Sequence, residues 1–286
     1  MAIVRVCSQR DHAMFNAAPF EFGYSWSVAY GLVVPLAIAA GLGALAWWRG
    51  WPRWVLVVAG VVVLWAVTGL VLINAVFGLN RPMRLPTERF LASGSGRVLD
   101  AGAGSGRAAV GVLLARPKAT VTGLDIYTGY WGIEGNTPDR FMTNARIAGA
   151  AHRAEARTGD MREMPFREAE FDAVVSAYAI DHLSRDGSAT AIAEVARVLK
   201  PRGEFLLMIV NADWLARLVS PHALAHHPRQ DPARWHALLE QSGFHVEEEG
   251  RRPATLYFLA RKRQQLPQNL NDRRKPRVSR ATTGAT

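Results

Sequence analysis

A short stretch of the chain joins an apolar run to an aspartate and three alternating glycines. Residues 98–106 read Val-Leu-Asp-Ala-Gly-Ala-Gly-Ser-Gly; the aspartate is Asp100, and the glycines are Gly102, Gly104 and Gly106. Glycine lets the backbone turn tightly and lets a ligand approach it closely. The free N–H groups of a helix that begins near Gly106 would favour a carboxylate. The stretch therefore predicts a site for a ligand that carries an amino-acid carboxylate.

Further polar residues follow the next predicted strands. Asp125 ends the second strand, where a carboxylate can accept both ribose hydroxyls of a nucleoside. Asp160 follows the third strand and can accept a hydrogen bond from an adenine amino group, with Met161 against the ring. Ile126, and Ala177 at the end of the fourth strand, complete the predicted cofactor-binding set. Ligands of open α/β sheets bind at these carboxyl ends.

Asp181 and His182 come shortly after the fourth predicted strand, where a reacting group would point. A histidine, with an unperturbed pKa of about 6.5, can act as a general base, and Asp181 is adjacent. Alternatively, Asp181 caps the following helix and His182 packs beside the cofactor.

Aromatic residues after Asp125 can form a wall of the adenosine or acceptor pocket, although ordinary packing explains them equally well. They are Tyr127, Tyr130 and Trp131. A histidine group further along the chain lacks acidic or cysteine partners, so no metal site is predicted. Its members are His222, His226 and His227.

The elements that must position these residues alternate between β-type and helical patterns. This alternation predicts an α/β domain with a parallel sheet covered on both faces. Only residues 249–254 separate the last two strands, so these two should pair antiparallel. The predicted strands are 97–101, 120–126, 154–158, 171–177, 204–210, 245–248 and 255–260, and the helices are 106–115, 138–148, 188–199 and 232–242.

This ordered set of motifs, from about Arg97 to Ala260, resembles the class I S-adenosylmethionine (SAM)-dependent methyltransferases. In particular, it resembles the small-molecule group that includes the ubiquinone/menaquinone C-methyltransferases. The matching pieces are the 100–106 loop, Asp125, residues 159–161, 171–176, 194–201 and 203–206. The resemblance implies a Rossmann-like seven-stranded sheet with an antiparallel last strand, SAM as cofactor, and methyl transfer to a small acceptor.

Two other classes of function remain open. One is a SAM-binding regulatory protein without catalysis. The other is a membrane-anchored NAD-dependent oxidoreductase. A dinucleotide-binding Gly-x-Gly-x-x-Gly pattern that starts at Gly102 would place its last glycine on Arg107, which disfavours the oxidoreductase.

Two long uncharged runs precede the predicted domain. They extend from Trp26 to Trp48 and from Trp54 to Phe77, and tryptophans lie at three of their four ends. As helices of about 1.5 Å rise per residue, both are long enough to cross a ~30 Å hydrocarbon core. Residues 26–77 are therefore predicted to form a transmembrane helical hairpin. A hairpin buried in an oligomer or a re-entrant hairpin is the alternative.

The charge distribution favours a membrane over nucleic acid as the partner. The formal net charge is +10, and the basic tail at 263–286, predicted to be disordered, lacks the aromatic residues that would bind single strands. More positive charge flanks the hairpin than lies in its turn. This predicts a multi-pass protein of the cell inner membrane, with residues 97–262 in the cytoplasm behind a linker at 78–96. The acceptor is then expected to be small and lipophilic or a lipid. The N-terminal segment 1–25 carries no assigned role, and the oligomeric state is left open.

Overall fold

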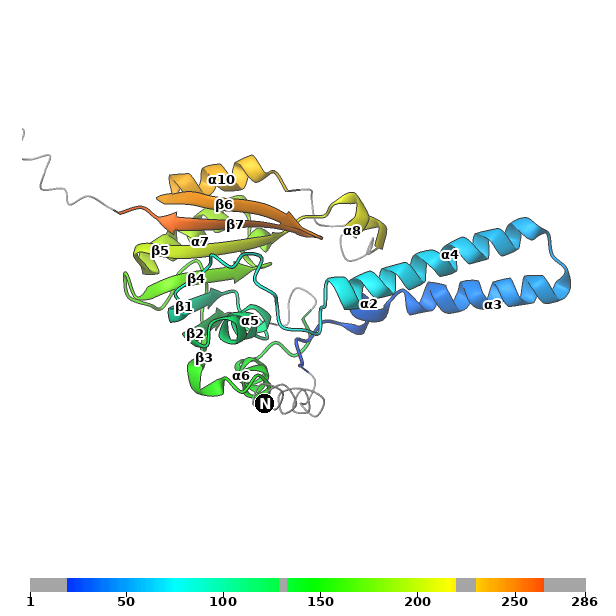
Figure 1. The fold of residues 1–286 in the computed structure, drawn as a ribbon, viewed down its shortest axis with the longest axis horizontal. Coiled ribbons are helices and arrows are strands. Elements are labelled where there is room, and N and C mark those ends of the chain that lie inside the picture. The colour runs from blue at the N-terminus through cyan, green and yellow to red at the C-terminus, as the bar shows by residue number, and fades with distance from the viewer. Residues whose placement is uncertain (1–19, 129–132, 220–229, 265–286) are drawn as a thin grey trace, which may run out of the picture.

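The computed structural model describes residues 20–128, 133–219 and 230–264. These residues form an α/β domain from which a long helical hairpin projects (Figure 1). Several residues singled out in the sequence lie outside the described part of the chain. They are Tyr130, Trp131, His222, His226, His227 and the tail from residue 265.

The sheet has seven strands in the order β3-β2-β1-β4-β5-β7-β6. β1 to β5 are parallel, while β7 is antiparallel to both β5 and β6. This confirms the predicted methyltransferase-type sheet with its reversed last strand. The strands are β1 (Ser95–Ala101), β2 (Lys118–Asp125), β3 (Ala154–Thr158), β4 (Phe171–Ala177), β5 (Leu199–Val210), β6 (Phe244–Arg252) and β7 (Thr255–Lys262).

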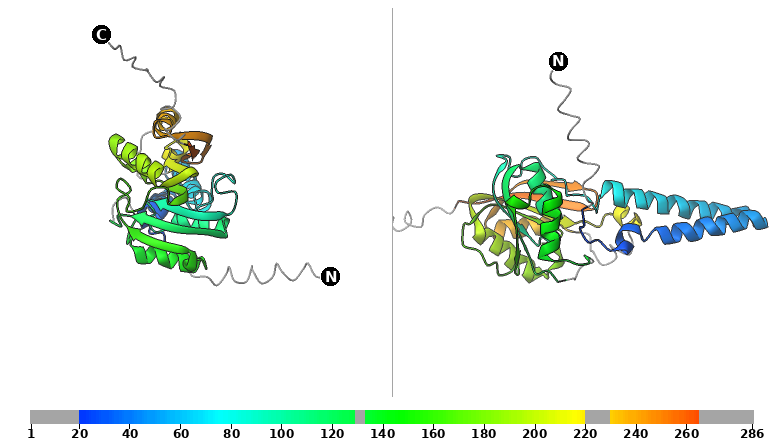
Figure 2. Two further views of the ribbon diagram at one scale, coloured as in Figure 1. Left: turned by 90° about the vertical axis from the view of Figure 1, so that its left-hand side faces the viewer. Right: turned by 90° about the horizontal axis from the view of Figure 1, so that it is seen from below.

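Helices cover both faces of the sheet (Figure 2). Neighbouring residues of a strand point to opposite faces, so Val98 and Leu99 of β1 enter two separate cores. α5 and α6 contribute to the core around Val98, and α7 and α10 to the core around Leu99. These helices are α5 (Arg107–Ala115), α6 (Pro138–Ile147), α7 (Arg185–Val198) and α10 (Pro232–Gln241), with a short 3₁₀ turn η2 (Ala151–Arg153) before β3.

Side-chain caps set the first residues of three of these helices. Thr137 accepts a hydrogen bond from Arg140 N at the start of α6. Asp231 does the same for α10, which begins with a proline. Ser184 caps α7, so this helix begins at Arg185 rather than at the predicted Ser188. The cap, which the apolar periodicity does not reveal, accounts for the extra turn.

Residues 78–96, predicted to be a linker, are packed against the α/β domain. Phe90 and Leu91 are buried in the same core as α5. The amide of Met83 donates to the carbonyl of Arg107, and buried Arg116 donates to the carbonyl of Phe90. The segment is therefore an ordered connection that packs against the α/β domain and attaches the hairpin to it.

The hairpin consists of α2 (Trp26–Tyr30), α3 (Val33–Arg49), α4 (Arg53–Val71) and a π-helical turn η1 (Leu72–Val76). The first apolar run is thus broken in two after Tyr30, whereas one continuous helix was predicted. Pro35 is a physical reason for the break, because it has no N–H for the carbonyl of Gly31 and its ring would clash with that carbonyl.

Among the described residues, only the helix from Arg53 to Val76 is long and apolar enough to cross a membrane. α3 has 17 residues, which corresponds to about 26 Å. The helical hairpin itself is present, but two full spans are not confirmed. Large apolar side chains cover its outer surface, among them Val57, Leu64 and the tip residues Trp47, Trp48 and Trp54.

Candidate functional site

The glycine loop lies between β1 and α5, at the carboxyl edge of the sheet. Gly102 has a φ of +81°, a backbone conformation that is strained for any residue with a side chain. A Cβ atom at this position would collide with the Cβ of Ala179 and lie 2.8 Å from Cε of Met161. The loop therefore touches the segments after β3 and after β4, so the structure brings together three of the regions predicted to meet here.

Asp125, the last residue of β2, holds the loop from the other side. Its Oδ2 accepts a hydrogen bond of 2.9 Å from the amide of Gly104. Its Oδ1 accepts from the amide of Tyr127 at 2.7 Å and from Nδ2 of Asn136 at 3.2 Å. The carboxylate is thus fixed beside the loop, and its predicted contact with ribose hydroxyls stays a prediction.

Asp100 is fully buried at the end of β1. Its Oδ2 accepts a 2.8 Å hydrogen bond from the amide of Ala109, while Oδ1 has no hydrogen-bond partner. Burial raises the pKa of this carboxyl to about 7; the Ala109 N–H opposes the rise and the charge of Asp125 adds to it. A cationic ligand group beside Oδ1 would stabilise the ionised form.

Other buried polar atoms around the loop also lack hydrogen-bond partners. They are the hydroxyls of Ser105 and Tyr127 and Oδ1 of Asn136. Because buried polar atoms are normally paired, such a group indicates a polar ligand. An ammonium could bind Asp100, and hydroxyls could bind Asp125 and Asn136. The residues present therefore fit an amino-acid-bearing nucleoside.

Asp160 and Met161 follow β3 as predicted, but Asp160 already has a partner. Its carboxylate binds the guanidinium of Arg162, with Oδ2 and Nη2 2.6 Å apart. The hydrogen bonds of Arg162 lower the pKa of Asp160. An adenine amino group would have to share this carboxylate, and the predicted contact stays a prediction. Ile126 is half exposed after β2.

Ala177 pairs with Met208 at the end of β4, and the chain then enters a short 3₁₀ turn, η3 (Ile180–His182). Asp181 does not cap α7, because Ser184 does so. Instead, Oδ2 of Asp181 accepts a 2.8 Å hydrogen bond from the amide of Val210 in β5. Burial lowers the pKa of His182, which keeps its imidazole neutral at pH 7 and able to accept a proton.

Two residues of the site carried no recognisable signal in the sequence. Asn136 lies in the connection before α6, and only the folded chain brings it to Asp125. Asn144 is fully buried and donates to the carbonyls of Ser105 and Glu21, while its Oδ1 accepts from the Glu21 amide. It ties the segment before the hairpin to the glycine loop.

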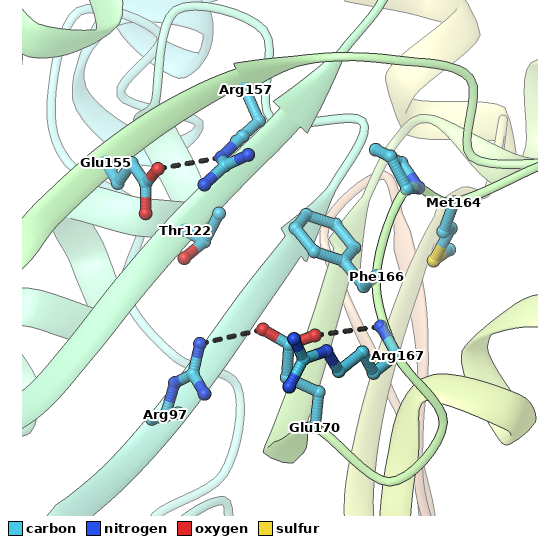
Figure 3. A pocket seen from close by; sticks show the side chains of 9 residues that line it. Arg97, Thr122, Glu155, Arg157, Met164, Phe166, Arg167 and Glu170 are labelled. Carbon is cyan, nitrogen blue, oxygen red and sulfur yellow. Dashed lines mark hydrogen bonds and ion pairs between the residues drawn. The ribbon is translucent and has the colours of Figure 1, made fainter.

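A separate polar hollow of about 530 Å³ lies on the face of β1–β3 (Figure 3). The connection between β3 and β4 passes over this face without a helix. Two ion pairs lie within the hollow, Arg97 with Glu170 and Arg157 with Glu155. It contains none of the predicted site residues. No group of three metal-ligating side chains occurs within the described ranges.

Comparisons with known proteins identify related chains. A family model described as "Methyltransferase domain" matches residues 98–203. The ubiquinone/menaquinone biosynthesis C-methyltransferase of Syntrophotalea carbinolica is 31% identical over 133 residues, which cover 46% of this chain and 52% of that protein. The chain thus spans about half the length of this relative.

An uncharacterized methyltransferase of Synechocystis sp. is 31% identical over 178 residues, covering 59% of this chain and 76% of the relative. Among solved structures, a SAM-dependent methyltransferase from Methanosarcina mazei has a TM-score of 0.47 and 20% identity. That match covers 60% of this chain and 94% of the solved chain.

Proposed function

The chain belongs to the SAM-dependent methyltransferase family, and we propose that it methylates a small lipophilic molecule held at a membrane. The observation that carries the proposal is the junction between hairpin and cofactor loop. The exposed apolar hairpin ends at Phe77, whose carbonyl accepts a hydrogen bond from Arg107, directly after the glycine loop. This contact supports the proposal, because it joins the hairpin base to the residue that follows the proposed methyl-donor loop.

Each part of SAM has a chemical counterpart around the loop. The carboxylate would bind the free N–H groups at the start of α5, and the ammonium would bind Asp100. The ribose hydroxyls would bind Asp125, whose hydrogen bonds to the loop already orient it. Met161 and Ile126 would contact the adenine ring. The orphan Oδ1 of Asp100 supports this arrangement, since an ammonium would satisfy it.

SAM supplies a methyl group that its sulfonium already activates for in-line displacement. The protein then has to align the acceptor and exclude water, and alignment alone can contribute about 7–11 kcal/mol. A base is needed only where the acceptor must lose a proton. The neutral His182 supports this role for acceptors such as a phenol, with Asp181 holding the turn against β5.

We infer that the hairpin anchors the domain on the cytoplasmic side of the inner membrane. The exposed valines and leucines of α4 and the tryptophans at the tip support insertion into the membrane. The orientation is supported by the flanks of the hairpin, which carry more positive charge than Arg49 and Arg53 in its turn. Since backbone groups in lipid must be paired internally, the helical form of both arms suits insertion.

To test the proposal, the full-length protein in membranes is incubated with SAM that carries an isotopically labelled methyl group. The lipid extract is then analysed by mass spectrometry. We expect label in a molecule of the organic phase, and none with Asp125→Ala. Binding of SAM without its consumption would indicate a regulatory protein instead. Label confined to water-soluble products would overturn the lipophilic acceptor.

A further inference from the structure

α8 (Trp214–Val219) is the short helix that follows β5. α8 packs against the hairpin: Nε1 of Trp65 in α4 donates a 2.7 Å hydrogen bond to the carbonyl of Leu218. Figure 1 shows α8 beside the basal part of α4. α8 is therefore held alongside the hairpin itself.

The position of Trp65 along α4 sets the depth of α8. Trp65 lies eleven residues after Trp54 at the tip, a distance of about 17 Å along the helix. The hydrocarbon core of a bilayer is ~30 Å thick. If the tryptophans of the tip lie at the far interface, the core extends past Trp65 towards the domain. The contact point with α8 then lies at the level of lipid chains.

The surface of α8 suits that environment. Trp214 is 76% exposed and Leu218 is 53% exposed, so large apolar side chains face outwards. Two polar side chains at α8 make local hydrogen bonds, although Arg217 is itself exposed. Asp213 accepts from the amide of Ala216, and Nε of Arg217 donates to the carbonyl of Ala212. A helix that exposes large apolar side chains together with a basic residue is suited to a membrane interface.

α8 also follows closely on the part of β5 that contacts Asp181, in the turn where methyl transfer is proposed. β5 ends at Val210, whose amide binds Asp181. Asn211 follows, buried, and its amide donates to the carbonyl of Ala254. The helix begins three residues later. The chain from the methyl-transfer region to α8 is thus short and fixed.

From this placement we propose that α8 is embedded in the proximal leaflet and that the acceptor enters from the lipid beside the contact of α8 with α4. The inference rests on the proposed function and deepens it. The acceptor class becomes molecules dissolved in the bilayer, whose group to be methylated reaches the site without crossing water.

Spin labels on single cysteines in proteoliposomes test this placement. Cys7 is replaced by serine, and cysteines replace Leu218 on α8, Leu64 on α4 and Leu114 on α5, all exposed leucines. Labels at 218 and 64 should collide with oxygen more often than with a water-soluble nickel complex, and the label at 114 should do the opposite. Trp65 donates its hydrogen bond to the backbone carbonyl of Leu218, so replacing the side chain at this position leaves the hydrogen bond in place.

The outcomes separate the inference from the proposed function. A lipid-facing label at 64 with a water-facing label at 218 overturns the inference and leaves the anchored enzyme intact. A water-facing label at 64 overturns the membrane anchor itself. For the entry route, Leu218→Glu should reduce labelling of lipid acceptors roughly fivefold or more without weakening SAM binding, because a charge in lipid is costly. Unchanged labelling in Leu218→Glu would overturn the route.

Discussion

The guanidinium of Arg107 donates a hydrogen bond of 2.8 Å to the carbonyl of Phe77. The same side chain also binds the carbonyls of Gly78 at 3.1 Å and Arg81 at 3.0 Å. Arg107 is the first residue of α5, and Phe77 closes the helical end of the hairpin. One cation thus joins the residue after the glycine loop to the hairpin, and its charge suits a helix C-terminus.

Replacing Arg107 with methionine should therefore loosen this junction. The part-buried carbonyls lose their donor, which costs about 1–3 kcal/mol of unfolding free energy. Thermal unfolding in detergent measures the loss. Arg146→Met is the matched control, because Arg146 is exposed and its described hydrogen bond reaches only Thr143, within the same helix. Equal shifts for both variants would contradict the role of Arg107.

Asp125→Ala should weaken S-adenosylhomocysteine binding by at least about tenfold, because ribose hydroxyls would lose a charged acceptor. The amide of Gly104 would lose its partner as well. Calorimetry on the full-length protein checks this, with Asp139→Ala, an exposed carboxylate on α6, as control. Wild-type affinity in a folded Asp125→Ala protein would remove Asp125 from the site.

The raised pKa of Asp100, about 7, predicts pH-dependent ligand binding. The ligand ammonium needs the ionised carboxylate, whose population in the free protein rises as the pH rises towards and past 7. Affinity for S-adenosylhomocysteine should therefore increase almost tenfold from about pH 6 to pH 7.5, by linkage. Asp100→Asn should bind weakly and without this dependence. An equal pH dependence in both proteins would show that another group is responsible.

The raised pKa of Asp100 also predicts that the ligand-free protein becomes less stable as the pH rises, whereas ligand binding becomes tighter. Since the folded pKa of Asp100 is raised, the folded state holds its proton more tightly than the unfolded state does. The stabilisation is full below about pH 4 and is lost as the pH rises through about 7. Thermal unfolding of the ligand-free protein should show a steeper loss over that range than Asp100→Asn does. An equal dependence of thermal stability on pH in the wild type and in Asp100→Asn would contradict this role of Asp100.

Gly102→Ala should abolish SAM binding. The new methyl group would collide with Ala179, and the φ of +81° would be strained. Gly60→Ala on α4 is the control, because a Cβ there meets no atom within 4 Å. Its helix should be unharmed, and SAM binding should stay normal. Normal binding by Gly102→Ala would show that the loop can move to accept a side chain.

His182→Ala tests the general base. If His182 accepts the acceptor's proton, methyl incorporation should fall about 10²-fold or more while S-adenosylhomocysteine affinity is unchanged. Because burial lowers the pKa of His182, wild-type activity should persist below pH 6.5 before it declines. A variant that loses cofactor binding instead would identify His182 as a packing residue.

Local sequence was sufficient for much of the fold. β3 and β4 occupy the residues predicted for them, because short β-type runs end at polar residues or turns. The short connection between the last two strands required antiparallel pairing, which the structure has. The glycine loop and Asp125 could be placed at one edge because parallel strands end there together.

Other features depend on contacts between residues far apart in the chain. Asn144 meets Glu21 across 123 positions and Trp65 meets Leu218 across 153, and no local pattern encodes such pairs. The same is true of the packing of residues 78–96 and of Asn136 beside Asp125. The sequence by itself determined most of the strands and helices of the α/β domain and the residue types of the loop, since both follow from local spacing. Only the tertiary structure decided that the hairpin base lies against the start of α5, directly after the glycine loop, because side chains that pair across the fold make that junction.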